Sequence, residues 1–200
     1  MTGSRFLVLV EGKSYPYDLC RGVSMLKRTS SLGHLAIQIA ARGMGMRVIG
    51  IDHTSKESII KDCGAEVYID HTKGNAEEEV KAATGGLGVQ AVLVCTAANG
   101  AYASGMGLLK FGGTLVCVGL PEGEMQPIAT AFPQLMVARS LNIVGSAVGD
   151  RRQAIETLQM AERGVVKTHY KTVGKEKLTE IFEQMDKGEV SGRVVLDLAA

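Results

Sequence analysis

The stretch that decides the fold runs from residue 27 to residue 52 and reads KRTSSLGHL (27–35) followed by AIQIAARGMGMRVIGID (36–52). The second part predicts a helix and then a buried strand that is rich in β-branched residues and ends in an acid, Asp52. A helix, a strand and a terminal acid are typical of the second half of a dinucleotide-binding βαβ unit. Such a unit normally opens with a glycine-rich turn, whereas the turn here reads RTSSLG (28–33).

The turn before the helix keeps only one of the usual glycines, Gly33. Side chains at the other positions block the approach of a pyrophosphate, or force backbone angles that cost about 1–3 kcal/mol each. Ser30 and Ser31 are small and retain their N–H groups, and Arg28 adds a positive charge for a phosphate. Helix packing is the alternative explanation for Gly33.

Asp52 lies 19 residues after Gly33, a spacing that suits a carboxylate accepting hydrogen bonds from the adenosine ribose hydroxyls. That carboxylate repels a 2′-phosphate and therefore selects NAD over NADP. Lys56, one helical turn further on, is placed to reach the same ribose. The alternative is that Asp52 caps a loop and Lys56 is a solvated surface charge.

Short apolar runs alternate with helical stretches along the remaining chain, which predicts βαβ units. The expected fold class is α/β, a Rossmann-like doubly wound parallel sheet with an incomplete or substituted first strand. We assign residues 22–200 to one dinucleotide-binding domain and leave residues 1–21 unassigned. Two segments are candidates for the first strand, GVSMLK (22–27) and FLVLV (6–10). Expected strands cover residues 46–52, 65–70, 89–96, 112–119, 140–146 and 192–198.

Composition and charge narrow the function classes. Hydrophobic residues make up 46%, charged residues 22%, and the formal net charge is +1, which argues against nucleic-acid and anionic membrane partners. No apolar run approaches the roughly 20 residues of a membrane span, and no signal peptide is evident, so we expect a cytoplasmic protein. Cys95 and Cys117 lie inside apolar runs and are expected to be buried thiols.

The run from residue 31 to residue 73, together with GTLVCVGLPEG (113–123), SLNIVGSAVGDRRQAIETLQMAERGVVK (140–167) and EVSGRVVLDL (189–198), resembles a known family. It is similar to the nucleotide-binding domain of zinc-dependent, medium-chain alcohol dehydrogenases, especially the yeast and fungal tetrameric kind. The resemblance covers roughly residues 30–198. It implies NAD as cofactor, alcohol/aldehyde interconversion by ancestry, and a possible homo-oligomer through the strand near residues 140–149.

The resemblance also implies roles for individual residues. The adenosine ribose would contact Asp52 and Lys56, and the phosphate turn would include Leu32 and Gly33. The nicotinamide would lie beside Val118 and Leu120, the carboxamide near the backbone of Ser146 and Val148, and the pyrophosphate near Arg193. Core packing is the alternative explanation for the three apolar residues Val118, Leu120 and Val148.

The family's other half, a catalytic domain that carries most catalytic zinc ligands, the proton relay and a structural zinc lobe, has no counterpart in this sequence. The segment CRGVSMLKRTS (20–30) resembles the helix that supplies the family's last catalytic zinc cysteine, which places that ligand on Cys20. A catalytic zinc needs about three protein ligands, and the four histidines are too scattered to complete the set, so we expect no zinc in this chain. No catalytic acid, base or nucleophile stands out.

Three hypotheses follow. The chain is an alcohol dehydrogenase-like oxidoreductase domain that is weak or inactive by itself, a non-catalytic NAD-binding or oligomerisation module, or a truncated remnant.

Overall fold

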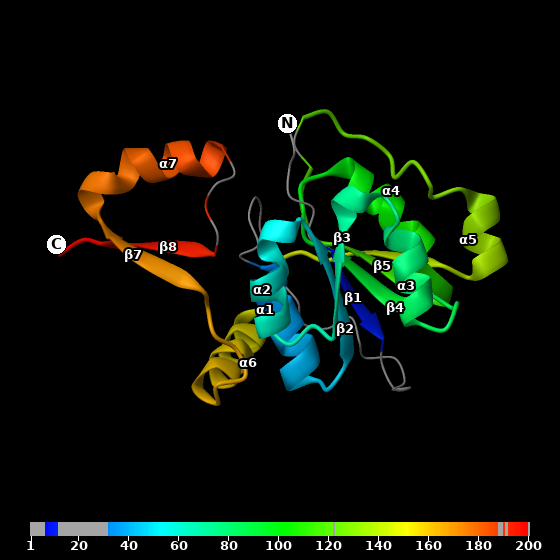
Figure 1. Ribbon diagram of the computed structural model, residues 1–200, viewed down its shortest axis with the longest axis horizontal. Helices are drawn as coiled ribbons and strands as arrows, with labels where there is room; N and C mark the ends of the chain where they lie inside the picture. The colour runs from blue at the N-terminus through cyan, green and yellow to red at the C-terminus, as the bar shows by residue number, and fades with distance from the viewer. Residues whose placement is uncertain (1–6, 12–31, 122, 188–189, 191, 200) are drawn as a thin grey trace.

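The computed structural model describes residues 7–11, 32–121, 123–187, 190 and 192–199. Within them the chain forms a six-stranded sheet in the order β3-β2-β1-β4-β5-β6 and a separate two-stranded sheet, β7-β8 (Figure 1). The strands of the large sheet are β1 (Leu7–Glu11), β2 (Arg47–Asp52), β3 (Val67–Asp70), β4 (Val89–Val94), β5 (Leu109–Cys117) and β6 (Asn142–Gly145). The order and the helices between the strands confirm the Rossmann-like, doubly wound α/β fold.

Helices cover both faces of this sheet. The helical elements up to residue 162 are α1 (Gly33–Gln38), which continues as the π-helix η1 (Ile39–Gly43), η2 (Thr54–Lys56), α2 (Glu57–Asp62), η3 (His71–Lys73), α3 (Ala76–Ala83), α4 (Asn99–Leu108), α5 (Pro133–Arg139) and α6 (Arg151–Glu162). One core joins Ile49 and Ile51 to α3 and α4, and the other joins Val48 to α1 and α2. Alternate residues of β2 thus face opposite cores, as the two-residue period of a strand requires.

The central strand β1 runs against its neighbours. Leu7 pairs with Ile51 of β2 and with Val94 of β4, both antiparallel, whereas the other four pairings of the two sheets are parallel. Of the two segments considered for the first strand, FLVLV therefore supplies it, and residues 22–27 lie outside the described residues. This strand comes from the segment before residue 22, which the sequence left unassigned. The large sheet is therefore mixed, whereas a parallel sheet was expected.

The last part of the chain forms a unit of its own. β7 (Tyr170–Gly174) and β8 (Arg193–Asp197) pair in parallel, with η4 (Lys175–Lys177) and α7 (Leu178–Asp186) between them. Figure 1 shows this unit beyond α6, away from the large sheet. The strand expected at 192–198 is thus present as β8 but does not join the large sheet, because it pairs with β7. The sequence patterns did not predict β7.

Candidate functional site

Asp52 ends β2 at the edge of the sheet where the parallel strands have their carboxyl ends. Its side chain is fully buried. Oδ1 accepts a hydrogen bond of 2.6 Å from the backbone N–H of His53, whereas Oδ2 has no hydrogen-bond partner within the described part of the chain. Burial raises the pKa of Asp52 to about 7, although the His53 N–H and the charge of Lys56 act in the opposite direction. The carboxyl group therefore lacks one donor.

Asp70 ends the neighbouring strand β3 and is in direct register with Asp52. Unlike Asp52, its carboxylate is well supplied with donors: the Thr54 hydroxyl, the Thr72 hydroxyl at 2.7 Å and the Thr72 N–H at 2.9 Å. These hydrogen bonds hold the pKa of Asp70 well below its usual range. The two adjacent acids thus differ in their environment: burial raises the pKa of Asp52, whereas hydrogen bonds lower the pKa of Asp70.

Lys56 is the other ribose residue suggested by the sequence, and the structure buries it to 7% exposure at the end of η2. It lies close enough to Asp52 for its charge to lower that residue's pKa. The interpretation of Lys56 as a solvated surface charge is therefore wrong. The backbone carbonyl of Asp52 also accepts a hydrogen bond of 3.2 Å from the Tyr68 hydroxyl, which ties β3 to the end of β2.

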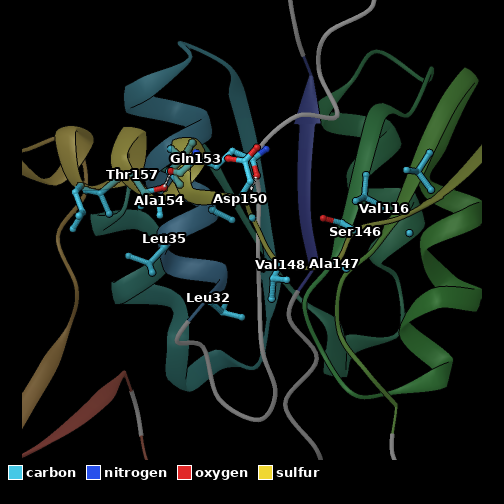
Figure 2. A pocket seen from close by; sticks show the side chains of 17 residues that line it. Leu32, Leu35, Val116, Ser146, Ala147, Val148, Asp150, Gln153, Ala154 and Thr157 are labelled. Carbon is cyan, nitrogen blue, oxygen red and sulfur yellow. Dashed lines mark hydrogen bonds between the residues drawn. The ribbon is translucent and has the colours of Figure 1, made fainter.

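A cavity of about 630 Å³ lies between helices α1 and α6 on one side and strands β5 and β6 on the other (Figure 2). A volume of this size suits a small-molecule site. The residues that line it are Leu32, Leu35, Ala36, Ile39, Val116, Val144, Gly145, Ser146, Ala147, Val148, Gly149, Asp150, Gln153, Ala154, Thr157, Leu158 and Val166. Apolar side chains from α1 therefore face a mixed wall from α6 and from the loop after β6.

The polar wall of the cavity starts with the capping box of α6. The carboxylate of Asp150 accepts from the Gln153 N–H at 2.8 Å, and the Gln153 side chain accepts from the Asp150 N–H at 2.9 Å. The cavity residues Asp150, Gln153 and Thr157 were not among the predicted site residues. The aspartate three residues before a glutamine was the available signal, because that spacing is a capping box.

The structure gathers only part of the predicted site. Leu32, Ser146 and Val148 line the cavity together, whereas Asp52, Lys56, Gly33, Val118, Leu120 and Arg193 do not. Val118 is buried after β5, where its N–H bonds to the Val94 carbonyl, while Leu120 is 64% exposed. Arg193 is exposed at the start of β8, in the separate sheet. Its predicted contact with the pyrophosphate stays a prediction, as do the other cofactor roles.

The metal prediction falls on Cys20, which lies outside the described residues. Among the residues that are described, no three His, Cys, Asp or Glu side chains are grouped so as to hold a metal ion. Cys63, Cys95 and Cys117 are free thiols, and the first two are buried. None of the described helices has both the length and the apolar character needed to cross a bilayer.

The strand order and the acid at the end of β2 define a Rossmann-like domain of the dinucleotide-binding class. The profile of the zinc-binding dehydrogenases matches residues 31–163, and the chain belongs to this family. The chain is 48% identical over 206 residues to alcohol dehydrogenase 2 of Emericella nidulans. The alignment covers 90% of this chain and 56% of that protein. The chain is 37% identical to an alcohol dehydrogenase of Schizosaccharomyces pombe, over 84% of this chain and 47% of that one.

Solved structures give the same fold. The alcohol dehydrogenase of Aeropyrum pernix aligns with a TM-score of 0.74 at 24% identity, over 88% of this chain and 50% of that one. The chain spans about half the length of the curated relatives it matches. It is thus a domain of the zinc-binding dehydrogenase family.

Proposed function

We propose that this chain is the NAD-binding part of an alcohol dehydrogenase-like oxidoreductase and that Asp52 binds the adenosine ribose. The observation that carries the proposal is the buried Oδ2 of Asp52, which lacks a donor at the carboxyl edge of the sheet. A ribose hydroxyl supplies the missing donor, and two such bonds to one carboxylate are typical of NAD recognition in this fold. A 2′-phosphate on NADP would instead bring negative charge next to Asp52 and Asp70.

The cavity beside α1 and α6 supports the same proposal for the other end of the cofactor. Leu32 and Val148 give it apolar walls, and Ser146 and Thr157 add hydroxyl groups. A planar amide-bearing ring suits such a mixture of surfaces. NAD, when bound, supplies the hydride chemistry; the residues of this chain orient it, and none of those described is placed to activate an alcohol.

A titration of thermal stability tests this proposal. NAD at a hundredfold excess over its dissociation constant should stabilise the chain by about 2.7 kcal/mol, and NADP should stabilise it less. Asp52→Asn should weaken NAD binding, because an amide does not accept two hydroxyl donors as a carboxylate does. Asp70→Asn is the matched control, one strand away and already supplied with donors. Equal shifts with NAD and NADP, or no shift at all, would contradict the proposal.

A second candidate function, a homodimer through the free edge of β6, rests on a separate observation. β6 ends the large sheet, and Ile143 on this strand and Val137 on α5 are exposed, the latter at 83%. Edge strands with exposed apolar side chains tend to pair. Sedimentation should show a dimer that Ile143→Asp converts to a monomer, while Thr172→Asp on β7 leaves it intact. A monomeric wild-type chain at micromolar concentration would refute it.

A further inference from the structure

The two acids at the ends of β2 and β3 differ in the number of hydrogen bonds that they accept. Asp70 receives three hydrogen bonds, from Thr54 and Thr72. Asp52 receives one, from the His53 N–H, and its other oxygen is buried without a partner among the described residues. Burial of a carboxyl oxygen without a hydrogen-bond donor destabilises the ionised form of the group and so favours the protonated form.

The charged and titratable groups around Asp52 come from its own loop and from β3. Lys56 and His53 follow it in the chain, Asp70 and Tyr68 face it from β3, and Glu57 begins α2 near Tyr68. Lys56 favours the ionised form of Asp52, while the negative Asp70 opposes it. Burial outweighs the attraction of Lys56, so the pKa of Asp52 lies near 7.

We propose that Asp52 is a proton-linked binding group: it holds a proton in the unliganded chain and releases that proton to solvent when a ligand hydroxyl donates to Oδ2. This inference rests on the proposed function, because the ligand is the ribose of NAD. The only covalent bond that breaks is the O–H bond of the acid: its electron pair stays on the carboxylate, its proton passes to a water or buffer molecule, and the ribose hydroxyl donates a hydrogen bond to the oxygen. The neighbouring Asp70 stays ionised throughout, since its three donors remain in place.

The consequence is an affinity that depends on pH near neutrality. If the ionised form alone binds the ribose, the competent fraction sets the apparent dissociation constant, which should be about tenfold larger at pH 6 than at pH 8. Selectivity against NADP should fall at the lower pH as well, because a protonated Asp52 does not repel a 2′-phosphate.

Calorimetric titration of the full chain with NAD, at pH 6 and pH 8 and in two buffers of different ionisation enthalpy, tests this linkage. We expect release of nearly one proton per bound NAD at pH 6, little release at pH 8, and the tenfold change in affinity. Asp70→Asn should keep the pH dependence with a slightly lower midpoint, because it removes a like charge.

The outcomes separate this inference from the proposed function. Binding of NAD with the same affinity and no proton release at both pH values would refute the linkage and leave the proposed function standing. Absence of binding at both pH values would refute the proposed function and the inference with it. An Asp52→Asn variant that still releases a proton on binding NAD would also overturn the inference, because the released proton would then come from another group.

Discussion

Gln38 and Lys167 are 129 residues apart in the sequence, and they exchange two hydrogen bonds. The Gln38 amide donates to the Lys167 carbonyl at 2.9 Å and accepts from the Lys167 N–H at 2.8 Å. Next to this pair, the ring of His169 meets that of buried His34 edge to face, with centroids 5.2 Å apart. These contacts attach the segment that leads to β7 onto helix α1.

Replacing Gln38 by leucine should loosen this attachment. The variant leaves both backbone groups of Lys167 without their partner, at a cost of about 1 kcal/mol for each hydrogen bond. We expect a lower midpoint of urea unfolding and faster amide exchange at Lys167. The control is Gln184→Leu, whose side-chain bond to Glu180 lies at the surface of α7. Unchanged exchange at Lys167 would show that the pair does not hold the segment.

Asp52→Asn should stabilise the unliganded chain at high pH. The pKa of Asp52 rises from 3.8 to about 7 in the folded state, so its favourable contribution is complete below pH 4 and is lost as pH rises through 7. A shift of about three units corresponds to about 4 kcal/mol. Chemical denaturation at pH 4 and pH 8 should therefore give the variant a higher free energy of unfolding than the wild type only at pH 8.

Asp70→Asn should show the opposite pH dependence. The pKa of Asp70 is lowered by its hydrogen bonds, so the ionised group stabilises the fold above pH 4 and loses this effect as pH falls. The variant should be less stable than the wild type at pH 8, with a difference that shrinks in acid. The same sign of effect in both aspartate variants at pH 8 would contradict the division of roles between the two acids.

Gly119→Ala tests the close approach of the chain beyond β5 to the end of β4. A Cβ atom on Gly119 would lie 2.1 Å from the Thr96 carbonyl oxygen, so the two segments would have to separate. We expect a loss of about 1–3 kcal/mol, as for other overpacked sites. Gly145→Ala on β6 is the control, because a Cβ there meets nothing within 4 Å. Thermal unfolding of both variants gives the comparison.

The isolated chain should bind no zinc and should not oxidise ethanol. By resemblance to the family, the sequence offers one zinc ligand, Cys20. A catalytic zinc site needs about three protein ligands. Elemental analysis after metal loading, together with an assay of NADH formation, measures both properties. One zinc per chain with ethanol-dependent NADH production would overturn this prediction.

Much of the fold was predictable from local patterns. The expected strand at 46–52 forms as Arg47–Asp52, and the helix expected before it begins as α1, Gly33–Gln38. β-Branched runs and capping residues are local signals, and here the tertiary structure agrees with them. Tyr170–Gly174 was missed because its mostly exposed residues give no apolar alternation.

The site was predictable only in part. The spacing from Gly33 to Asp52 identified the acid at the strand end, but not its burial or its unpartnered oxygen, because these depend on residues from β3 and η2. The direction of β1 was also beyond the sequence. A five-residue apolar run looks the same in either direction, so only pairing with β2 and β4 determines its orientation.

The reversed strand β1 has a consequence for how the chain is made. Among the described strands, β1 alone joins the pair β3-β2 to the trio β4-β5-β6. It is the first of the described strands in the sequence, yet its neighbour β4 begins about 80 residues later. Pairing of β1 with β4 therefore joins segments that are distant in the sequence, and the sheet cannot be completed before β4 has been synthesised.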